Sequence, residues 1–113
     1  MSKLLLPLTR RDPVNICKSV PTVPNVFDPL TTKVDDVIVG CANPEGEQGL
    51  QVARLISARA LGKEVPGVTI NRYCASGLEA ISMAVSKVKA GFGHIFIAGG
   101  IDSMSLIRMT GYK

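Results

Sequence analysis

Short apolar runs alternate with longer segments of helical periodicity from Val34 onward. The runs are rich in β-branched residues and predict strands at residues 37–41, 68–73 and 95–98. The longer segments predict helices at residues 49–61 and 76–90, because apolar positions recur every three or four residues and a glycine follows each segment. Since strands that alternate with helices form parallel sheets, the predicted fold class is α/β with a parallel β-α-β-α-β core.

The second predicted helix has one expected buried face. Its apolar residues recur every three or four positions and form a single stripe of Leu78, Ile81, Val85 and Val88. Lys87 and Lys89 lie in the last turn, where positive charge stabilises the negative end of a helix. We therefore expect this helix to pack on the sheet through that stripe.

The first 33 residues follow a different pattern. They contain five of the seven prolines and none of the eleven glycines. Because proline lacks a backbone donor and restricts the residue before it, no long helix or central strand can pass through this segment. We expect an irregular, proline-rich lead-in at residues 1–33, with one possible short strand at residues 4–6, followed by a folded domain at residues 34–113.

Parallel topology places the carboxyl ends of the three predicted strands at one edge of the sheet. In open α/β sheets, ligands bind beyond this edge. Cys41, Cys74 and the Gly99–Gly100 pair all fall at these strand ends. The candidate chemistry is therefore expected there.

Cys74 is the strongest candidate nucleophile. It lies where the second strand gives way to the second helix, and the amino end of a helix stabilises a thiolate, the nucleophilic form of cysteine. Ala75, Ser76 and Gly77 are small, so a carbonyl group can approach the sulfur and the first helical N–H groups together, as in an oxyanion pocket. The competing interpretation is a small buried hydrophobic residue, the commonest role of a free cysteine.

The other candidate residues have less support. Cys41 is followed by a proline-bearing loop without a helix, so we expect it to pack in the core, and Cys17 lies in the lead-in without supporting context. His94, the only histidine, begins the third strand, whereas Cys74 follows the end of the second. A strand of about five residues would separate these two side chains by roughly 16 Å. His94 is therefore predicted to be exposed or capping, not the base for Cys74.

Composition argues against several other functions. Charged residues make up 19% of the chain, and the net charge of +4 is scattered, which argues against nucleic-acid binding. The sequence has no apolar stretch of the ~20 residues that a membrane span needs, no phosphate-binding glycine loop and no metal-ligand spacing. Three cysteines without a C-x-x-C pair favour a reducing compartment. We expect a cytoplasmic location, with an organellar one as the alternative.

Three segments resemble motifs of the thiolase family: VDDVIVGCANPEGEQG at residues 34–49, NRYCASGL at residues 71–78 and AGGIDSMS at residues 98–105. Their order also matches, and NRYCASGL is the most specific of the three. The resemblance implies a thiolase-like amino-terminal layer, incomplete relative to the family. It also implies that Cys74 attacks an acyl-CoA carbonyl and carries the acyl group as a thioester, in reversible carbon–carbon bond cleavage or formation.

The resemblance also implies a substrate and a partner. The substrate would be an acyl-CoA, with no cofactor beyond this coenzyme A thioester, and residues 68–73 would lie at a two-fold homodimer interface. The PEGEQG form of the loop resembles degradative 3-ketoacyl-CoA thiolases, which act in fatty acid β-oxidation, more than short-chain biosynthetic ones.

The sequence departs from the family pattern at several points. It has no Gly-His-Pro histidine, no asparagine-bearing motif and no second catalytic cysteine motif, since His94 lies in Gly-His-Ile. Asp102 stands where glutamate is expected, and Gln51 where asparagine is expected. We therefore expect this chain to be inactive by itself. Two alternatives stay open: a non-catalytic fragment that pairs with a complete thiolase, and a condensing enzyme related to ketoacyl synthases.

Overall fold

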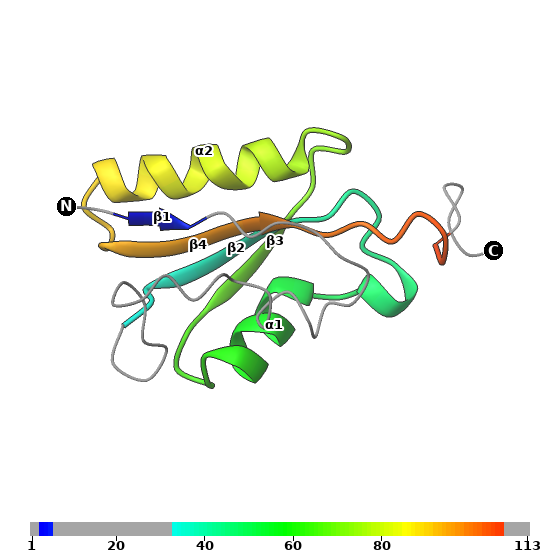
Figure 1. Cartoon of the computed structure of the whole chain (residues 1–113), viewed down its shortest axis with the longest axis horizontal. Helices are drawn as coiled ribbons and strands as arrows, with labels where there is room; N and C mark the ends of the chain where they lie inside the picture. Colours follow the sequence, from blue (N-terminus) through cyan, green and yellow to red (C-terminus); the bar gives the residue numbers. More distant parts are fainter. Residues whose placement is uncertain (1–2, 6–32, 108–113) are drawn as a thin grey trace.

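The computed structural model describes residues 3–5 and 33–107, which form a parallel sheet covered by a helix on each face (Figure 1). Neighbouring strands pair in the order β1-β4-β2-β3, and every pair is parallel. The strands are β1 (Lys3–Leu5), β2 (Asp36–Gly40), β3 (Gly67–Ile70) and β4 (Ile95–Gly100). The helices are α1 (Val52–Ala60), α2 (Ser76–Lys89) and the short 3-10 helix η1 (Gly46–Gln48). The predicted α/β class with a parallel core is confirmed.

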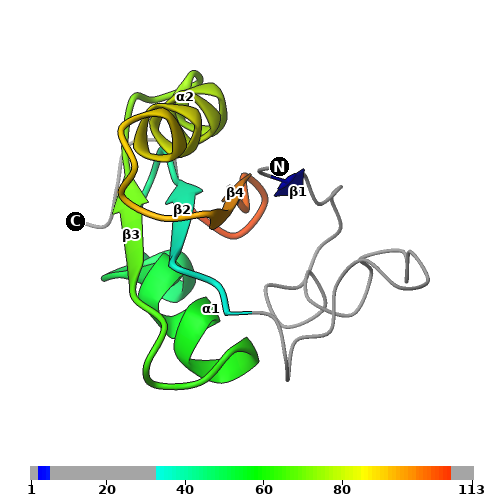
Figure 2. The same cartoon turned by 90° about the vertical axis from the view of Figure 1, so that its left-hand side faces the viewer.

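The two helices lie on opposite faces of the sheet (Figures 1 and 2). Strand side chains alternate between the faces, so Val37 and Val39 pack with α1 in one cluster, whereas Ile38 packs with Ala80 and Ala84 of α2 in the other. Strand β2 is buried over its whole length because helices cover it on both sides. It is the central element on which both halves of the core are built.

The lead-in contributes one short strand to the sheet. Lys3–Leu5 forms β1, one residue earlier than the predicted position, and pairs with the outer edge of β4. The proline-rich remainder of the lead-in, residues 6–32, lies outside the described residues, as do residues 1–2 and 108–113. The predicted boundary between residues 33 and 34 therefore stays a prediction.

The face of α2 that packs on the sheet differs from the predicted stripe. Its fully buried residues are Ser76, Ala80 and Ala84, each four positions apart, whereas Leu78 is 71% exposed. Ile81 and Val88 are partly buried against the core, as predicted. Small side chains allow the helix backbone to approach the sheet closely, so the inward face consists of alanine and serine, with larger residues at its margin.

Helix α1 begins three residues later than predicted. Gly49 is extended, and Leu50 has a left-handed φ of +56°, a conformation that cannot continue a right-handed helix. The helix ends at Ala60, and Gly62 follows with a φ of +103°, as the predicted glycine stop requires. Among the described residues, no helix is both long and apolar enough to cross a membrane.

Candidate active site

The carboxyl ends of three strands meet in one row of the sheet. Gly40 of β2 pairs with Ile70 of β3 on one side and with Gly100 of β4 on the other. The chain leaves each strand just beyond this row, and the Cys41 N–H donates to the Ile70 carbonyl at 2.9 Å. The sequence prediction that these strand ends share one edge is confirmed. The candidate residues of the loops that follow are thereby brought together.

A short turn connects β3 to Cys74. The strand was predicted to continue to Tyr73, but it ends at Ile70, and Asn71 instead opens the turn. The Asn71 side-chain oxygen accepts the Tyr73 N–H at 2.8 Å, and Tyr73 has a left-handed φ of +46°. Asparagine favours such turns because its short side chain competes for backbone donors. The direction of the chain therefore changes sharply immediately before Cys74.

Ser76, the first residue of α2, holds this turn from the helix side. Its buried hydroxyl donates to the Tyr73 carbonyl at 2.6 Å and accepts the Arg72 N–H at 2.8 Å. The Arg72 guanidinium also pairs with Glu79 one turn along the helix, with Nε and Oε2 3.2 Å apart. No side chain caps the amino end of α2. The turn is thus fixed by the Ser76 hydroxyl and the Asn71 amide, which leaves the region in front of the helix free of a capping group.

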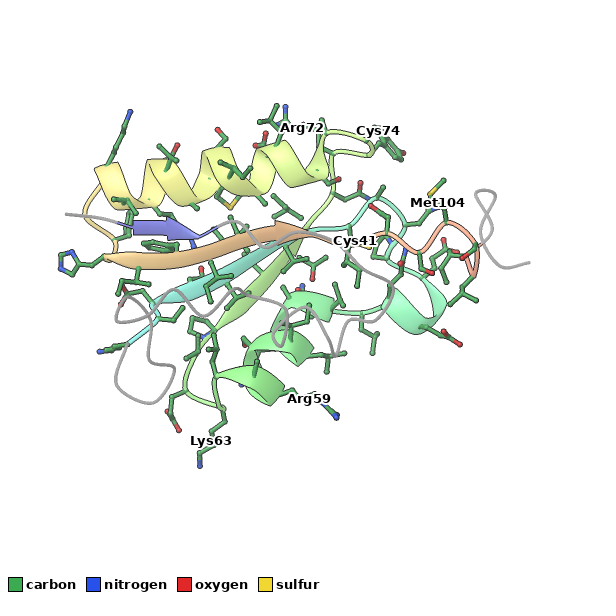
Figure 3. All side chains as sticks on the ribbon, viewed as in Figure 1. Cys41, Arg59, Lys63, Arg72, Cys74 and Met104 are labelled. Atoms are coloured by element: carbon green, nitrogen blue, oxygen red, sulfur yellow. The ribbon has the colours of Figure 1, made fainter. Side chains whose placement is uncertain are left out.

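The amino end of α2 is pressed against the end of β2. A β-carbon on Gly40 would lie 2.3 Å from the carbonyl carbon of Ser76, so only glycine permits this approach. As a result, Cys74 stands at the carboxyl edge and is exposed to solvent. Figure 3 shows it on the loop at the start of α2, at the outer side of the molecule. A nucleophile needs this combination of helix position and access.

Cys41 has the opposite environment. It is fully buried, and its Sγ lies 3.8 Å from Oδ1 of Asp102. Burial, together with the nearby Asp102 carboxylate, raises the pKa of the Cys41 thiol to about 11. Cys41 is therefore a protonated core residue at neutral pH, which agrees with the packing role expected from the sequence.

The remaining two candidates are Cys17 and His94. Cys17 lies outside the described residues. His94 is exposed, and its backbone N–H donates to Asp35 Oδ2 at 2.7 Å, just before the amino end of β4. It is therefore at the edge opposite Cys74, as predicted. Within residues 3–5 and 33–107, no three His, Cys, Asp or Glu side chains form a metal-binding group.

Sequence reasoning missed three polar residues that organise the edge. Asp102 accepts the Ala42 N–H, Gln48 accepts the Ser103 N–H at 2.7 Å, and Asn71 donates to the Ala42 carbonyl at 2.9 Å. Asp102 follows a strand that ends in Gly99–Gly100 at the ligand edge, and this position was the available signal. An open hollow of about 400 Å³ lies beside the loop after β2. It is lined by Pro44, Glu45, Gly46, Gly49 and Leu50, so Cys74 is not part of its lining.

Comparison with known families identifies the class of protein. The family model described as "Thiolase, N-terminal domain" matches residues 29–112, which is most of the chain. The chain therefore belongs to the thiolase family, and the three motifs and the fold agree with this assignment. The thiolase interpretation is favoured over the condensing-enzyme alternative.

Individual curated proteins that are similar to this chain are also thiolases. The chain is 51% identical over 80 residues to a 3-ketoacyl-CoA thiolase of Bacillus subtilis, an alignment that covers 70% of this chain and 20% of the relative. It is 53% identical over 74 residues to a beta-ketoadipyl-CoA thiolase of Acinetobacter baylyi, covering 65% and 18% of the two chains. A 3-oxoadipyl-CoA/3-oxo-5,6-dehydrosuberyl-CoA thiolase of Escherichia coli is 52% identical over 73 residues, covering 64% and 18%. The chain thus spans about a fifth of the length of these relatives.

Proposed function

We propose that Cys74 is the acyl-accepting nucleophile of a thiolase-type transfer between coenzyme A thioesters. The observation that carries this proposal is an exposed thiol in the turn that leads into α2, at the ligand edge of the sheet. In the acylation step, the sulfur of Cys74 forms a bond to the substrate carbonyl carbon. The bond from that carbon to its leaving group breaks, and the leaving group takes up a proton in place of the one that the Cys74 thiol releases. Coenzyme A thiol then displaces Cys74 and removes the acyl group.

The proposed substrate is a 3-ketoacyl-CoA, cleaved in the degradative direction as in fatty acid β-oxidation. The form of the loop at residues 44–49 supports this choice, as does the 3-ketoacyl-CoA thiolase of Bacillus subtilis among the similar proteins. Beta-ketoadipyl-CoA thiolases match equally well, so the shared chemistry is a 3-keto thioester of coenzyme A. No cofactor beyond coenzyme A is proposed.

The complete reaction also needs groups that move protons. The only histidine in these 113 residues is His94, at the opposite edge of the sheet from Cys74. We therefore propose that full turnover needs residues other than those in this chain. The isolated chain is expected to present its nucleophile but not to complete the catalytic cycle.

The first experiment measures which thiol reacts. We expect iodoacetamide at neutral pH to label Cys74 ahead of Cys17 and Cys41, as read by peptide mass spectrometry. Incubation with a 3-ketoacyl-CoA such as acetoacetyl-CoA followed by acid quenching should leave an acyl adduct on Cys74. Repeated turnover of the same substrate should stay at background.

The matched control is Cys74→Ser, which removes the thiol and keeps a small polar side chain. This variant should lose the acyl adduct and the fast labelling while it retains the far-UV circular dichroism of the parent chain. Preferential labelling of Cys17 or Cys41 in the parent chain would contradict the proposed role of Cys74.

A second candidate function is an interaction fragment that pairs with a complete thiolase or with a second copy. Among the described strands, β3 pairs only with β2 and is therefore an edge strand. Large exposed hydrophobic side chains also gather in the loops and first turns at the carboxyl edge: Leu50, Tyr73, Leu78, Met104 and Leu106. Such a free edge and exposed apolar groups favour association with another chain.

Gln51 provides a way to test pairing along β3. Its Oε1 accepts the Thr69 N–H at 3.0 Å, and this N–H faces away from β2 at the open edge. Gln51→Ala frees that donor and is expected to strengthen association, as measured by co-purification with a complete thiolase. Cys74→Ala should leave co-purification unchanged, because this function does not use the thiol. Loss of co-purification in Cys74→Ala would count against this candidate function. So would the absence of co-purification in the parent chain and in every variant.

A further inference from the structure

The carboxylate of Asp102 holds a loop that is distant in sequence. Asp102 lies two residues after β4, and it accepts the Ala42 N–H with both oxygens, at 3.0 and 3.1 Å. The Asn43 N–H donates to the same carboxylate at 3.2 Å. A carboxylate that accepts several backbone donors forms strong, charge-assisted bonds. The loop after β2 is therefore fixed to the segment after β4.

The buried side chain of Gln48 reinforces this attachment. Its Oε1 accepts the Ser103 N–H at 2.7 Å, and its Nε2 donates to the Asn43 carbonyl at 2.8 Å. The bond to Ser103 joins the loop to the segment after β4, and the bond to Asn43 holds the loop itself. Because only 3% of the Gln48 surface is exposed to solvent, these bonds are protected from competing water.

Asn71 extends the series of bonds to the turn before Cys74. Its Nδ2 donates to the Ala42 carbonyl at 2.9 Å, while its Oδ1 accepts the Tyr73 N–H at 2.8 Å. The peptide groups of Ala42 are therefore bonded to Asp102 through the N–H and to Asn71 through the carbonyl. Three successive bonds run from Asp102 through Ala42 and Asn71 to Tyr73.

The last residue of this series has an unfavourable backbone. Tyr73 has a φ of +46°, a backbone angle that residues other than glycine rarely adopt unless their surroundings impose it. The conformation of Tyr73 sets the direction in which the next residue, Cys74, leaves the turn. Bonds that hold Tyr73 therefore also hold Cys74 at the amino end of α2.

We propose that Asp102 and Asn71 are positioning residues that act on Cys74 through Ala42 and Tyr73. This inference rests on the proposed function of Cys74, and it adds a role for the one motif position where this sequence carries aspartate in place of the expected glutamate. The hydrogen bonds of Ser76 hold the turn locally. The bonds from Asp102 additionally couple the turn to the end of β4.

The test uses the 113-residue chain and follows the amide hydrogen exchange of Tyr73 by NMR. Asp102→Asn removes the charge and one acceptor oxygen without a change of size. It should accelerate Tyr73 exchange about fivefold or more, although Asp102 does not touch Tyr73, because residues in one network are coupled. Alkylation of Cys74 by iodoacetamide should slow several-fold, since the sulfur leaves the end of the helix. Asp102→Glu should restore part of both effects.

Asn71→Asp and a double variant test the order of the bonds. Asn71→Asp keeps the oxygen that accepts the Tyr73 N–H but places a second oxygen against the Ala42 carbonyl, so it cuts the connection to Asp102. The double variant should then exchange at Tyr73 no faster than Asn71→Asp alone. A multiplicative increase in the double variant would overturn the proposal, because it would mean that the two residues act independently.

Asp35→Asn is the matched control, because Asp35 also accepts two backbone N–H groups, at the opposite edge of the sheet. It should change Tyr73 exchange and Cys74 alkylation less than about twofold. The proposal would be overturned if Asp102→Asn accelerated amide exchange at Ala42 but left the exchange at Tyr73 unchanged. It would also be overturned if Asp102→Asn and Asp35→Asn changed Tyr73 exchange equally. If iodoacetamide does not prefer Cys74 in the parent chain, the proposed function fails, whereas Tyr73 exchange still decides the positioning role. Should Asp102→Asn not fold, Asn71→Asp supplies the same comparison.

Discussion

Gly40 and Ser76 approach each other so closely that a β-carbon on Gly40 would lie 2.3 Å from the Ser76 carbonyl carbon. The contact is between two backbones, so no side chain can move aside to relieve it. It joins the end of the central strand to the first turn of α2. The place of Cys74 at the sheet edge therefore depends on the absence of a side chain at residue 40.

The first prediction concerns this contact. Gly40→Ala should lower the free energy of unfolding by about 2–3 kcal/mol, because the added methyl group overpacks a rigid site. Urea denaturation followed by circular dichroism measures the change. Gly77→Ala is the control, since a β-carbon there meets nothing within 4 Å and alanine favours a helix by about 0.5–1 kcal/mol. Equal stability of Gly40→Ala and the parent chain would contradict the described packing.

The second prediction concerns the hydroxyl of Ser76. Ser76→Ala removes the acceptor of the Arg72 N–H and one donor to the Tyr73 carbonyl, and should cost about 1–2 kcal/mol of unfolding free energy. The exposed Ser82, in the same helix, has its side chain at the surface, so Ser82→Ala should change stability by less than about 0.5 kcal/mol. A comparison of urea midpoints separates the two. Similar small effects of both substitutions would show that the turn does not need the hydroxyl.

The third prediction is a pH effect at Cys41. Its pKa is raised from 9.0 to about 11, so the folded state retains the proton where the unfolded state loses it. The stability that this proton provides is fully present below pH 9 and is lost as the pH rises from 9.0 to about 11. Urea midpoints between pH 7 and 11 should fall more steeply for the parent chain than for Cys41→Ala. Parallel curves would show that the thiol does not titrate differently on unfolding.

The fourth prediction concerns Asp35 at the other edge of the sheet. The N–H groups of Ile95 and His94 hold the pKa of Asp35 below its ordinary value of 3.8. The carboxylate therefore contributes stability that is present above pH 3.8 and is lost as the pH falls through the lower pKa of the folded state. The stability difference between the parent chain and Asp35→Asn should be clear at pH 6 and should shrink below pH 3.8.

Glu64→Gln serves as the control for this acid effect. Glu64 lies 3.9 Å from Lys63, and both side chains are almost fully exposed, so this pair contributes little. Its removal should leave the urea midpoint unchanged at both pH values. A difference between Asp35→Asn and the parent chain that grows on acidification would have the wrong sign for the proposed bonds.

Much of the fold could be predicted from local patterns. The glycine after each helix marked its end, and the β-branched runs marked the three core strands to within a few residues. The largest errors in the element bounds occurred at Leu50 and Tyr73, which delay α1 and shorten β3. Both residues have positive φ angles without being glycine, so their own chemistry does not indicate a turn, and Asn71 was the only turn signal near the end of β3.

The sequence by itself determined the alternation of strands and helices, the parallel sheet and the placement of Cys74 at a strand-to-helix turn. These features follow from periodicity and turn residues within short windows of chain. Only the tertiary structure decided that α2 packs through alanine and serine, that the Asp102 carboxylate lies beside the Cys41 thiol, and that Asp102 holds Ala42. The last contact joins residues 60 positions apart. Such contacts arise because parallel pairing brings distant strand ends into one row, and no local pattern contains that information.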